Sequence, residues 1–465
     1  MKLLLYVLCL CTSWNIFSQN ESNLPLSLEE YIGYLKKYHP IVKQAKLITS
    51  FNEAKLLKAR GAFDPKIEVD YARKKFKNTN YYKRLNANFK IPTWYGIELK
   101  ANYENNSGQF LNPELNTPTD GLYNLGVSIP LAKNLLINKR MATLRQAKLY
   151  IQQSALTQQL LLNEVIFEAI SSYLNWLQYY QRHLVYQDYY TNAKNRLHNV
   201  IKNFKSGDKP AIDTLEANIN LKNRELDLEK ARIKYVKSTL ELANHLWISN
   251  NTPVELAPNI TPDTSTFLKI DALLKTPANL ASFNDLKNHP KLALLNLKRK
   301  NLYINKQLKI NNLLPEINFQ HNFLSAKANA NAFNVSNYKN SLQISIPLFL
   351  RKSRGDLKIA NLKLQDLDFE ISSTKVALQN KINAVKEAIH SFAKQDVILN
   401  DLVNNYRTIV SAEERKFSLG ESSIFLINYR EVKLIESRLK KIKNQYEYAN
   451  AKNKLIKALG ALNYL

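Results

Sequence analysis

Glycine and proline are scarce in this sequence. Its 465 residues include only 10 glycines and 15 prolines, about 5% together, against roughly 12% in average proteins. Because these residues interrupt helices and strands, their scarcity predicts long, unbroken elements. The apolar fraction of 45% is ordinary, which excludes a chain that is disordered throughout.

Cysteine is almost absent, and both cysteines, Cys9 and Cys11, lie near the N-terminus. One basic residue, Lys2, precedes nine apolar residues, and Ser18 offers a cleavage position. This pattern predicts that residues 1–18 are a secretory signal peptide. A buried N-terminal element and a lipoprotein signal remain alternatives. Once the signal peptide is removed, the chain can form neither a disulfide nor a cysteine-ligated metal site.

Long hydrophobic runs and acidic residues are also in short supply. After the N-terminal segment no stretch approaches the roughly 18 consecutive apolar residues of a transmembrane helix, so any crossing of a membrane requires strands. Lys and Arg number 66 against 39 Asp and Glu, a formal net charge of +27. In an exported protein we expect this excess to face anionic headgroups, an aqueous lumen or partner proteins, and we expect no nucleic acid partner.

Catalytic and metal-binding motifs are missing as well. The seven histidines are scattered and none lies in an H-E-x-x-H motif. The adjacent acidic pairs Glu29-Glu30 and Glu413-Glu414 lie at helical positions, where neighbours point to different faces. The sequence therefore predicts no catalytic residue, no metal, no cofactor and no enzymatic activity.

What the chain does contain is an internal repeat. His39-Pro40 recurs 250 residues later as His289-Pro290, and FKSG at 204–207 recurs 213 residues later as FSLG at 417–420. Such self-similarity indicates two copies of one structural plan. We predict a first repeat at 19–248 and a second at 283–465. Residues 249–282, rich in Pro, Ser, Thr and Asn, are predicted to be a linker that crosses the surface.

Within each repeat the hydrophobic period changes from 3.6 to 2 and back. Residues 27–61 have a helical pattern that breaks at His39-Pro40. Six later segments alternate apolar and polar residues, which is typical of strands with one apolar and one wet face. They are residues 66–73, 85–91, 97–103, 123–129, 317–323 and 342–346.

A very long helical pattern follows the strands of each repeat. Residues 138–206 and 356–419 contain neither Gly nor Pro, and the first would extend about 100 Å at ~1.5 Å per residue. The segments that follow them carry apolar residues at spacings of 3, 4 and 7, which predict a coiled-coil seam with the preceding helix. The predicted seam residues are Ile212, Leu215, Ile219, Leu226, Ile233, Val236, Leu240 and Ala243 in the first repeat, and Ile435, Leu439, Ile442, Tyr446, Ala449 and Ile456 in the second.

Aromatic residues gather in two places. A run from Phe167 to Tyr190 is predicted to pack between helical hairpins rather than bind a ligand. Trp94 and Tyr95 are predicted to lie at the rim of the strands, since such rings favour headgroup depth.

Together, the twofold repeat, the order helix, strands, long helix, turn, long helix, and the two F-x-x-G turns resemble the TolC-like outer-membrane efflux proteins. The resemblance covers nearly all of the chain after residue 18. It implies a mainly α-helical fold with a membrane β-barrel: two repeats of long helical hairpins plus amphipathic strands, which assemble as a trimeric α/β barrel tube. Family precedent is four strands per chain, so we favour four over the six segments counted above.

The resemblance also assigns the candidate sites. In this family the turns form the periplasmic entrance and dock an adaptor protein, which places Phe204, Gly207, Phe417 and Gly420 at the docking tips. The entrance of its best-known members is locked by an aspartate six residues after the first glycine, here Asp213. Its partner positions are here Phe417 and Ser422, which lack a suitable charge or phenol. Acidic rings six and nine residues after the second glycine are replaced by Leu426 and Tyr429.

The implied function is that of an outer-membrane channel in a tripartite efflux or secretion system, a passive exit from the periplasm. The implied partners are two further copies of the chain in a homotrimer, a periplasmic adaptor, an inner-membrane pump and outer-membrane lipid. The helical part would lie in the periplasm. A secreted or surface coiled-coil protein resembling an adhesin is the alternative; it accounts for the helices but not for two sets of amphipathic strands.

Overall fold

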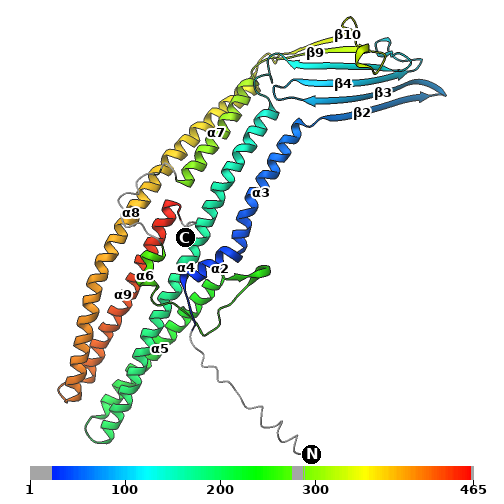
Figure 1. Ribbon diagram of the computed structural model, residues 1–465. Coiled ribbons are helices and arrows are strands. Elements are labelled where there is room, and N and C mark those ends of the chain that lie inside the picture. Colours follow the sequence, from blue (N-terminus) through cyan, green and yellow to red (C-terminus); the bar gives the residue numbers. More distant parts are fainter. Residues whose placement is uncertain (1–23, 275–285, 287–288, 462–465) are drawn as a thin grey trace, which may run out of the picture. The chain divides into compact units, whose positions relative to one another are not determined.

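The computed structural model describes residues 24–274, 286 and 289–461 (Figure 1). The predicted signal peptide lies outside the described residues. The chain forms two compact units: one contains residues up to 44, 162–283 and 380 onward, and the other contains 45–161 and 284–379. Below they are the helical unit and the sheet unit, respectively. Three helices contribute residues to both units: α3 (Pro40–Arg60), α4 (Lys139–Lys205) and α8 (Arg351–Ser418).

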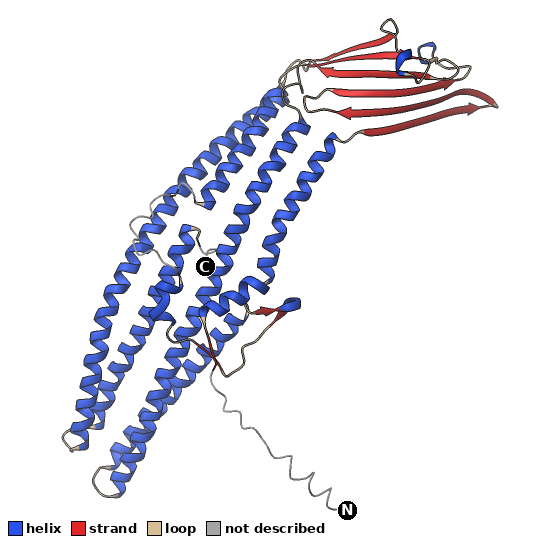
Figure 2. Cartoon of the chain, in the orientation of Figure 1, coloured by secondary structure: helices blue, strands red, loops and turns tan. Residues whose placement is uncertain are grey.

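The sheet unit is built around one six-stranded antiparallel sheet with the order β10-β9-β5-β4-β3-β2, drawn in red in Figure 2. The strands are β2 (Lys66–Phe76), β3 (Thr79–Pro92), β4 (Glu98–Ser107), β5 (Leu122–Pro130), β9 (Glu316–Ser325) and β10 (Tyr338–Ser345). All six predicted segments are therefore strands. The preference for four was wrong, because β3 and β4 form a hairpin that is inserted between β2 and β5 in the same sheet.

The register of the sheet separates its two faces. Phe89 lies opposite Ala101, Leu99 opposite Val127, and Ile344 opposite Ile317. The alternate positions are polar on the same strands, as where Asn88 lies opposite Asn102. Apolar side chains on the edge strands are largely exposed, such as Val69 on β2 and Leu342 on β10. The predicted division into an apolar and a wet face is confirmed.

The turn between β3 and β4 is attached to the first turn of α4. The side-chain amide of Asn138 donates to the carbonyl oxygen of Trp94 at 2.9 Å, and its Oδ1 accepts from the backbone N–H of Met141. Arg140 pairs with Glu98 at 2.8 Å. These contacts hold the β3–β4 turn against the start of α4. Tyr95, next to Trp94, is exposed.

Glycine is required in this turn. Gly96 has a φ of +75°, and a Cβ there would lie 2.5 Å from the carbonyl oxygen of Asn134. Both the left-handed backbone and the close approach exclude a larger residue. The β3–β4 hairpin is therefore an ordered, integral part of the sheet.

α7 (Pro290–Asn311) also belongs to the sheet unit and begins at the repeated His-Pro pair. The backbone N–H of Lys291 donates to Nδ1 of His289 at 3.1 Å, and in the first repeat the N–H of Ile41 donates to Nδ1 of His39 at 3.2 Å. Proline needs no N–H partner in the first turn of a helix. The repeated pair is therefore a helix start in both copies, and it produces the predicted break after α2 (Leu28–Tyr38).

The core of the helical unit is aromatic. Tyr31, Tyr173 and Trp176 are fully buried together with aliphatic side chains of α4, α5 (Ala211–Ala243) and α9 (Ile424–Leu459). The hydroxyl of Tyr173 donates to the carbonyl oxygen of Leu26 at 2.7 Å, and the indole N–H of Trp176 donates to Thr239 at 2.9 Å. Part of the predicted aromatic run thus forms the packed core of this unit.

The segment predicted to be a surface linker contributes to that core. It contains β7 (Thr252–Pro253), which pairs with β6 (Trp247–Ile248), and β8 (Ile260–Pro262), which pairs with β1 (Leu24–Leu26). It also contains α6 (Thr266–Leu273), whose Phe267 and Ile270 are buried. The prolines and serines of this segment predicted a loop, but apolar residues at helical spacing after residue 265 form a helix that packs into the core. The remainder, residues 275–282, lies outside the described residues.

The predicted long helices are confirmed, but only one of the two predicted seams is. On α9 the stripe is buried or half-buried, with Ala449 and Ile456 in the core. On α5 the stripe is exposed from Ile212 to Leu240, and only Ala243 at its end is half-buried; Leu226, for example, is 53% exposed. α5 instead buries a parallel row of mostly small and polar residues: Ala217, Asn220, Arg224, Ala231, Ser238 and Leu242.

Candidate functional site

The tips of the two helical hairpins have the same backbone geometry. Gly207 and Gly420 have φ values of +82° and +81°. The N–H of Gly207 donates to Phe204 O at 3.0 Å, and the N–H of Gly420 donates to Phe417 O at 3.1 Å. Each following N–H bonds a carbonyl five residues earlier. This is the left-handed ending of a helix that glycine favours.

Space around the two glycines is open. A Cβ placed on either would have no heavy atom within 4 Å beyond its chain neighbours. The glycines are therefore needed for the left-handed backbone and not for packing within the chain. The same open space leaves both tips accessible to another molecule.

The phenylalanines of the two F-x-x-G turns differ in environment. Phe204 is 43% exposed. Phe417 packs against a small cluster formed by Val200, Ala217 and Ile424, and the ammonium of Lys209 lies 4.7 Å from its ring centroid. One tip phenylalanine thus faces solvent, and the other holds the two tips of the chain against each other.

The predicted entrance residues lie on the first turns of the return helices. Asp213 is half-buried on α5, while Leu426 and Tyr429 are exposed on α9. Ser422 donates to Glu413, and Phe417 contacts Lys209. Within the described chain, Asp213 makes no ion pair or side-chain hydrogen bond with either predicted partner position.

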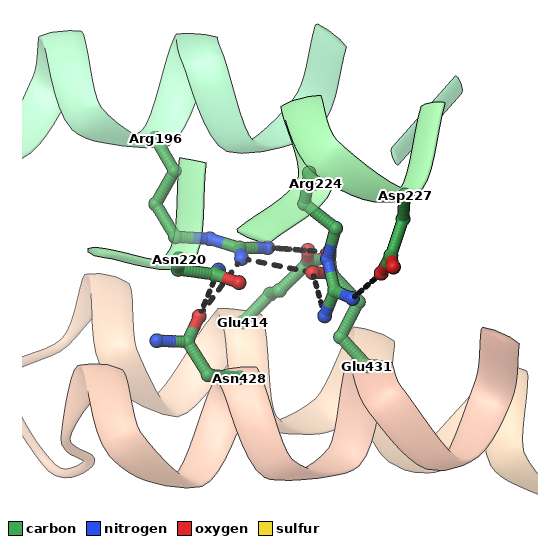
Figure 3. Close-up of polar contacts among 7 residues, drawn as sticks. All are labelled: Arg196, Asn220, Arg224, Asp227, Glu414, Asn428 and Glu431. Carbon is green, nitrogen blue, oxygen red and sulfur yellow. Dashed lines mark hydrogen bonds and ion pairs between the residues drawn. The ribbon is translucent and has the colours of Figure 1, made fainter. Parts of the chain in front are cut away.

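A buried ion cluster joins the two hairpins farther along the same helices (Figure 3). The two terminal guanidinium nitrogens of Arg196, Nη2 and Nη1, contact the carboxylate of Glu431 at 3.0 and 3.4 Å, and Arg224 reaches the same carboxylate at 3.7 Å. The ion cluster is defined by residues from all four helices: Arg196 on α4, Asn220, Arg224 and Asp227 on α5, Glu414 on α8, and Asn428 and Glu431 on α9.

Burial distinguishes the members of the ion cluster. Glu431 is 1% exposed and Arg224 is 5% exposed. Arg196 also pairs with the half-exposed Glu414 at 3.3 Å, and Asn220 donates to Asn428 at 2.6 Å. The two guanidinium groups, both from the first hairpin, compensate the charge of the buried carboxylate, which belongs to the second. The pairs therefore form only while the two hairpins stay together. Breaking one such buried pair costs ~3–5 kcal/mol.

Sequence reasoning missed the ion cluster, although a signal was present. Glu431 lies four residues before the seam residue Ile435, with the buried Ile424 and Ile427 at preceding 3- and 4-residue spacings. A charged residue at a seam position indicates a buried ionic partner. Arg224 holds the corresponding place in the row that α5 buries. That row could not be recognised because its other members are small or polar.

A pair of histidines lies elsewhere in the helical unit. The rings of His39 and His245 stack with centroids 5.8 Å apart. Burial lowers the pKa of His245 to about 4, aided by the neighbouring His39, and burial also lowers the pKa of His39. Both side chains are therefore neutral near pH 7.

The described residues offer little other chemistry. They contain no group of three or more His, Cys, Asp or Glu side chains that could hold a metal ion. Among the helices of the described part, none combines the length and apolar character that a membrane crossing requires. The candidate site therefore consists of two exposed regions, the tips and the entrance residues, and of the buried ion cluster behind them.

Comparison with known proteins identifies the fold. Residues 284–461 match the family model of the outer membrane efflux proteins. The search of curated proteins finds no significant match. Solved structures match over nearly the whole chain, although at low identity, so this likeness concerns the fold.

Two of these structures are outer membrane channels, and a third is an outer membrane protein. The CmeC outer membrane channel of Campylobacter jejuni is 15% identical with a TM-score of 0.66, covering 93% of this chain and 85% of that chain. The open state of the MtrE channel of Neisseria gonorrhoeae is 12% identical with a TM-score of 0.63, covering 96% and 93%. The outer membrane protein VceC of Vibrio cholerae is 11% identical with a TM-score of 0.64, covering 93% and 96%.

The resemblance inferred from the repeat and the two F-x-x-G turns is thus confirmed by both comparisons. The family match falls on the second repeat, and the structural matches extend to the first. The chain has the fold of the outer membrane channels, and its residues 284–461 match the family model of the outer membrane efflux proteins.

Proposed function

We propose that this protein is the outer-membrane channel of a tripartite efflux or secretion system, through which solutes leave the periplasm passively. The observation that carries the proposal is one chain with a two-faced sheet, open at both edges, and two long hairpins that end in matching glycine turns. The matching family and folds are those of outer-membrane channels. Such a protein needs no catalytic residue.

The dimensions of the sheet suit a bilayer. Its strands have 8 to 14 residues, and a tilted strand needs ~9–11 residues to cross the hydrocarbon. In lipid every backbone N–H and C=O must be paired, so a crossing sheet must close on itself. Among the described strands, β2 and β10 are each paired on one side only. We propose that β2 of one copy pairs with β10 of the next in a homotrimer, which would supply eighteen strands.

The exposed stripe of α5 provides a second surface for this assembly. Seven apolar side chains between Ile212 and Leu240 are each 41–64% exposed. Contiguous apolar surface of this kind marks a protein contact. Because α8 also exposes apolar side chains in the helical unit, such as Val397 and Ile398, we propose that α5 packs against α8 of a neighbouring copy.

The tips are the proposed contact with a periplasmic adaptor, and through it with an inner-membrane pump. Support comes from the open space at Gly207 and Gly420 and from the exposed rings of Phe204 and Tyr429. Exposed aromatic side chains are common anchors of protein interfaces. Leu426 would add apolar area beside them.

The ion cluster is the proposed restraint on the periplasmic entrance. Arg196 and Arg224 belong to the first hairpin, and Glu431 belongs to the second. A change that moves one hairpin away from the other must break these buried pairs. In this chain, we propose, the ion cluster holds the hairpins together, and Asp213 does not act as a lock.

Purification from the outer membrane tests the proposal. We expect the protein to fractionate with the outer membrane, to require detergent, and to form ion-conducting pores in a planar bilayer. A chain that is released without detergent and produces no conductance would contradict a channel and favour the coiled-coil surface protein.

A further inference from the structure

The sheet unit contains a groove whose position and lining have no role in the proposed channel. It is lined by α4, α7 and α8 and has a volume of about 940 Å³. This lies at the upper end of the ~300–1,000 Å³ typical of small-molecule sites. Its lining combines positive charge with apolar area.

Five basic side chains line the groove and only one acidic side chain does. The acid, Asp368, is paired with Arg299 at 3.0 Å. In the described part of the chain the other four basic residues have no acidic partner. They are Arg145 and Lys148 on α4 and Lys300 and Lys306 on α7.

Like charges gathered around a groove repel one another and oppose folding, whereas an anion between them relieves the repulsion. Arg145 already makes a cation–π contact, because its guanidinium lies 5.5 Å from the ring centroid of Trp94. Lys148 and Lys300 are exposed and approach the groove from two different helices. The two lysines therefore offer ammonium groups to one ligand.

Apart from Asn361 and Gln365, the rest of the lining is apolar. Leu149, Tyr303, Ile304 and Leu364 contribute to it, and Tyr303 is 53% exposed. An inorganic anion would leave this area in water. A ligand with one anionic group and an aliphatic chain would satisfy both the lysines and the apolar side chains.

The position of the groove along the helices distinguishes two sources of such a ligand, a lipid of the bilayer and a free amphiphile. Lys148 lies nine residues after Lys139, where α4 begins, and Lys300 lies eleven residues before Asn311, where α7 ends, or roughly 13–17 Å along the helices. The headgroup zone extends only about 5–8 Å beyond the hydrocarbon on each side. The two lysines therefore lie beyond the depth of bilayer headgroups if the strands span the membrane, as proposed above.

We infer that this groove binds a free single-chain anionic amphiphile, such as a fatty acid or an alkyl sulfate. The anionic head lies between Lys148 and Lys300, and the chain lies against Tyr303 and Ile304. The inference concerns a binding site and does not depend on transport.

The test uses the full-length protein in nanodiscs of zwitterionic phospholipid, which avoids competition by detergent. The probe is a dansyl-labelled undecanoic acid, and its methyl ester is the neutral counterpart. We expect saturable binding of the acid, with the ester at least about tenfold weaker because it lacks the charge. Equal binding of acid and ester to the unaltered protein would overturn the inference, whatever the variants do.

Variants locate the site. Lys148→Gln combined with Lys300→Gln should weaken binding of the acid by about tenfold or more. Lys363→Gln is the matched control, because Lys363 is exposed on α8 but does not line the groove; it should leave binding unchanged. Equal losses in both variants would indicate a diffuse effect of charge and would contradict this site.

A last arm distinguishes the source of the ligand. Anionic phospholipid added to the nanodisc should leave binding of the probe unchanged. Displacement of the probe by that lipid would mean that bilayer lipid occupies the groove, and the assignment to a free amphiphile would be wrong.

Discussion

Replacing Glu431 by Gln tests the ion cluster most sharply. The substitution keeps the size of the side chain and removes its charge. Arg224, 5% exposed, would then be left with Asp227 at 3.8 Å, while Arg196 would keep Glu414 and Asn428. Loss of one partner of a buried pair costs ~3–5 kcal/mol. Since Arg196 retains contacts, we expect a loss at the lower end of this range, about 3 kcal/mol of the free energy that holds the two hairpins together.

The assay must report on the hairpins rather than on the whole chain. Spin labels at Ser206 and Glu421, both exposed near the tips, measure the distance between the hairpins. A loss of about 3 kcal/mol corresponds to roughly a hundredfold change in an equilibrium between joined and separated hairpins. We expect a broader and longer distance distribution in Glu431→Gln, and a lower free energy of unfolding.

Glu414→Gln is the matched control. Glu414 contacts the same arginine at 3.3 Å, but its side chain is half-exposed, and exposed pairs contribute at most about 1 kcal/mol. We expect little change in the distance distribution. If Glu431→Gln behaved like Glu414→Gln, burial would not determine the strength of the pair and the reasoning would fail.

Three further predictions concern other parts of the helical unit. Gly420→Trp should leave the assembled protein intact but abolish adaptor binding in a pull-down. Gly420→Ala should keep adaptor binding and lower the free energy of unfolding by only the ~1–2 kcal/mol of a non-glycine residue in the left-handed conformation. Retained binding in the Trp variant would mean that Gly420 serves only as a helix cap. Leu226→Asp should preserve helical circular dichroism but reduce assembly, because Leu226 is 53% exposed within the chain; loss of helix content with no separate assembly defect would contradict an intermolecular contact. Finally, the pKa of His245 is lowered to about 4 and that of His39 is also lowered, so the contribution of these histidines to stability should be complete above the unfolded pKa near 6.5. The free energy of unfolding should then fall as the pH drops towards 4, by about 1 kcal/mol for His245 at pH 5.5. Chemical denaturation of His245→Phe should show a flatter pH dependence, and a slope equal to that of the unaltered protein would refute the assignment.

The sequence predicted the elements well, because their signals are local. The lack of Gly and Pro between 138 and 206 predicted one helix, and α4 covers nearly all of that range. Alternating residues at 66–73 and 317–323 predicted strands at the positions of β2 and β9. Such periodicities depend only on the geometry of a single element.

Assignments that depended on partners were less successful. The stripe on α5 was assigned to the hairpin seam because it is apolar, but α5 packs within the chain through small residues such as Ala217 and Ala231. A hydrophobic period identifies a face, but it does not identify the molecule that covers the face. For the same reason the preference for four strands was wrong, since the pairing of β3 with β2 and β4 is a property of the folded sheet and not of one strand.

The ion cluster illustrates a third kind of limit. Its two arginines and Glu431 come from three helices and lie up to 235 residues apart in sequence. Only the folded arrangement brings Arg196 to Glu431, and Asp213, which occupies the lock position of the resembling family, takes no part in the ion cluster.

The central claim is that copies of this chain close their sheets, β2 to β10, into one channel. Single-particle electron microscopy of the detergent-solubilised protein tests it most directly. The account predicts a particle of three chains with a closed ring of eighteen strands, in which β2 of each chain lies beside β10 of the next. A single chain with an open sheet, or a ring of twelve strands from which the β3–β4 hairpin is excluded, would contradict it.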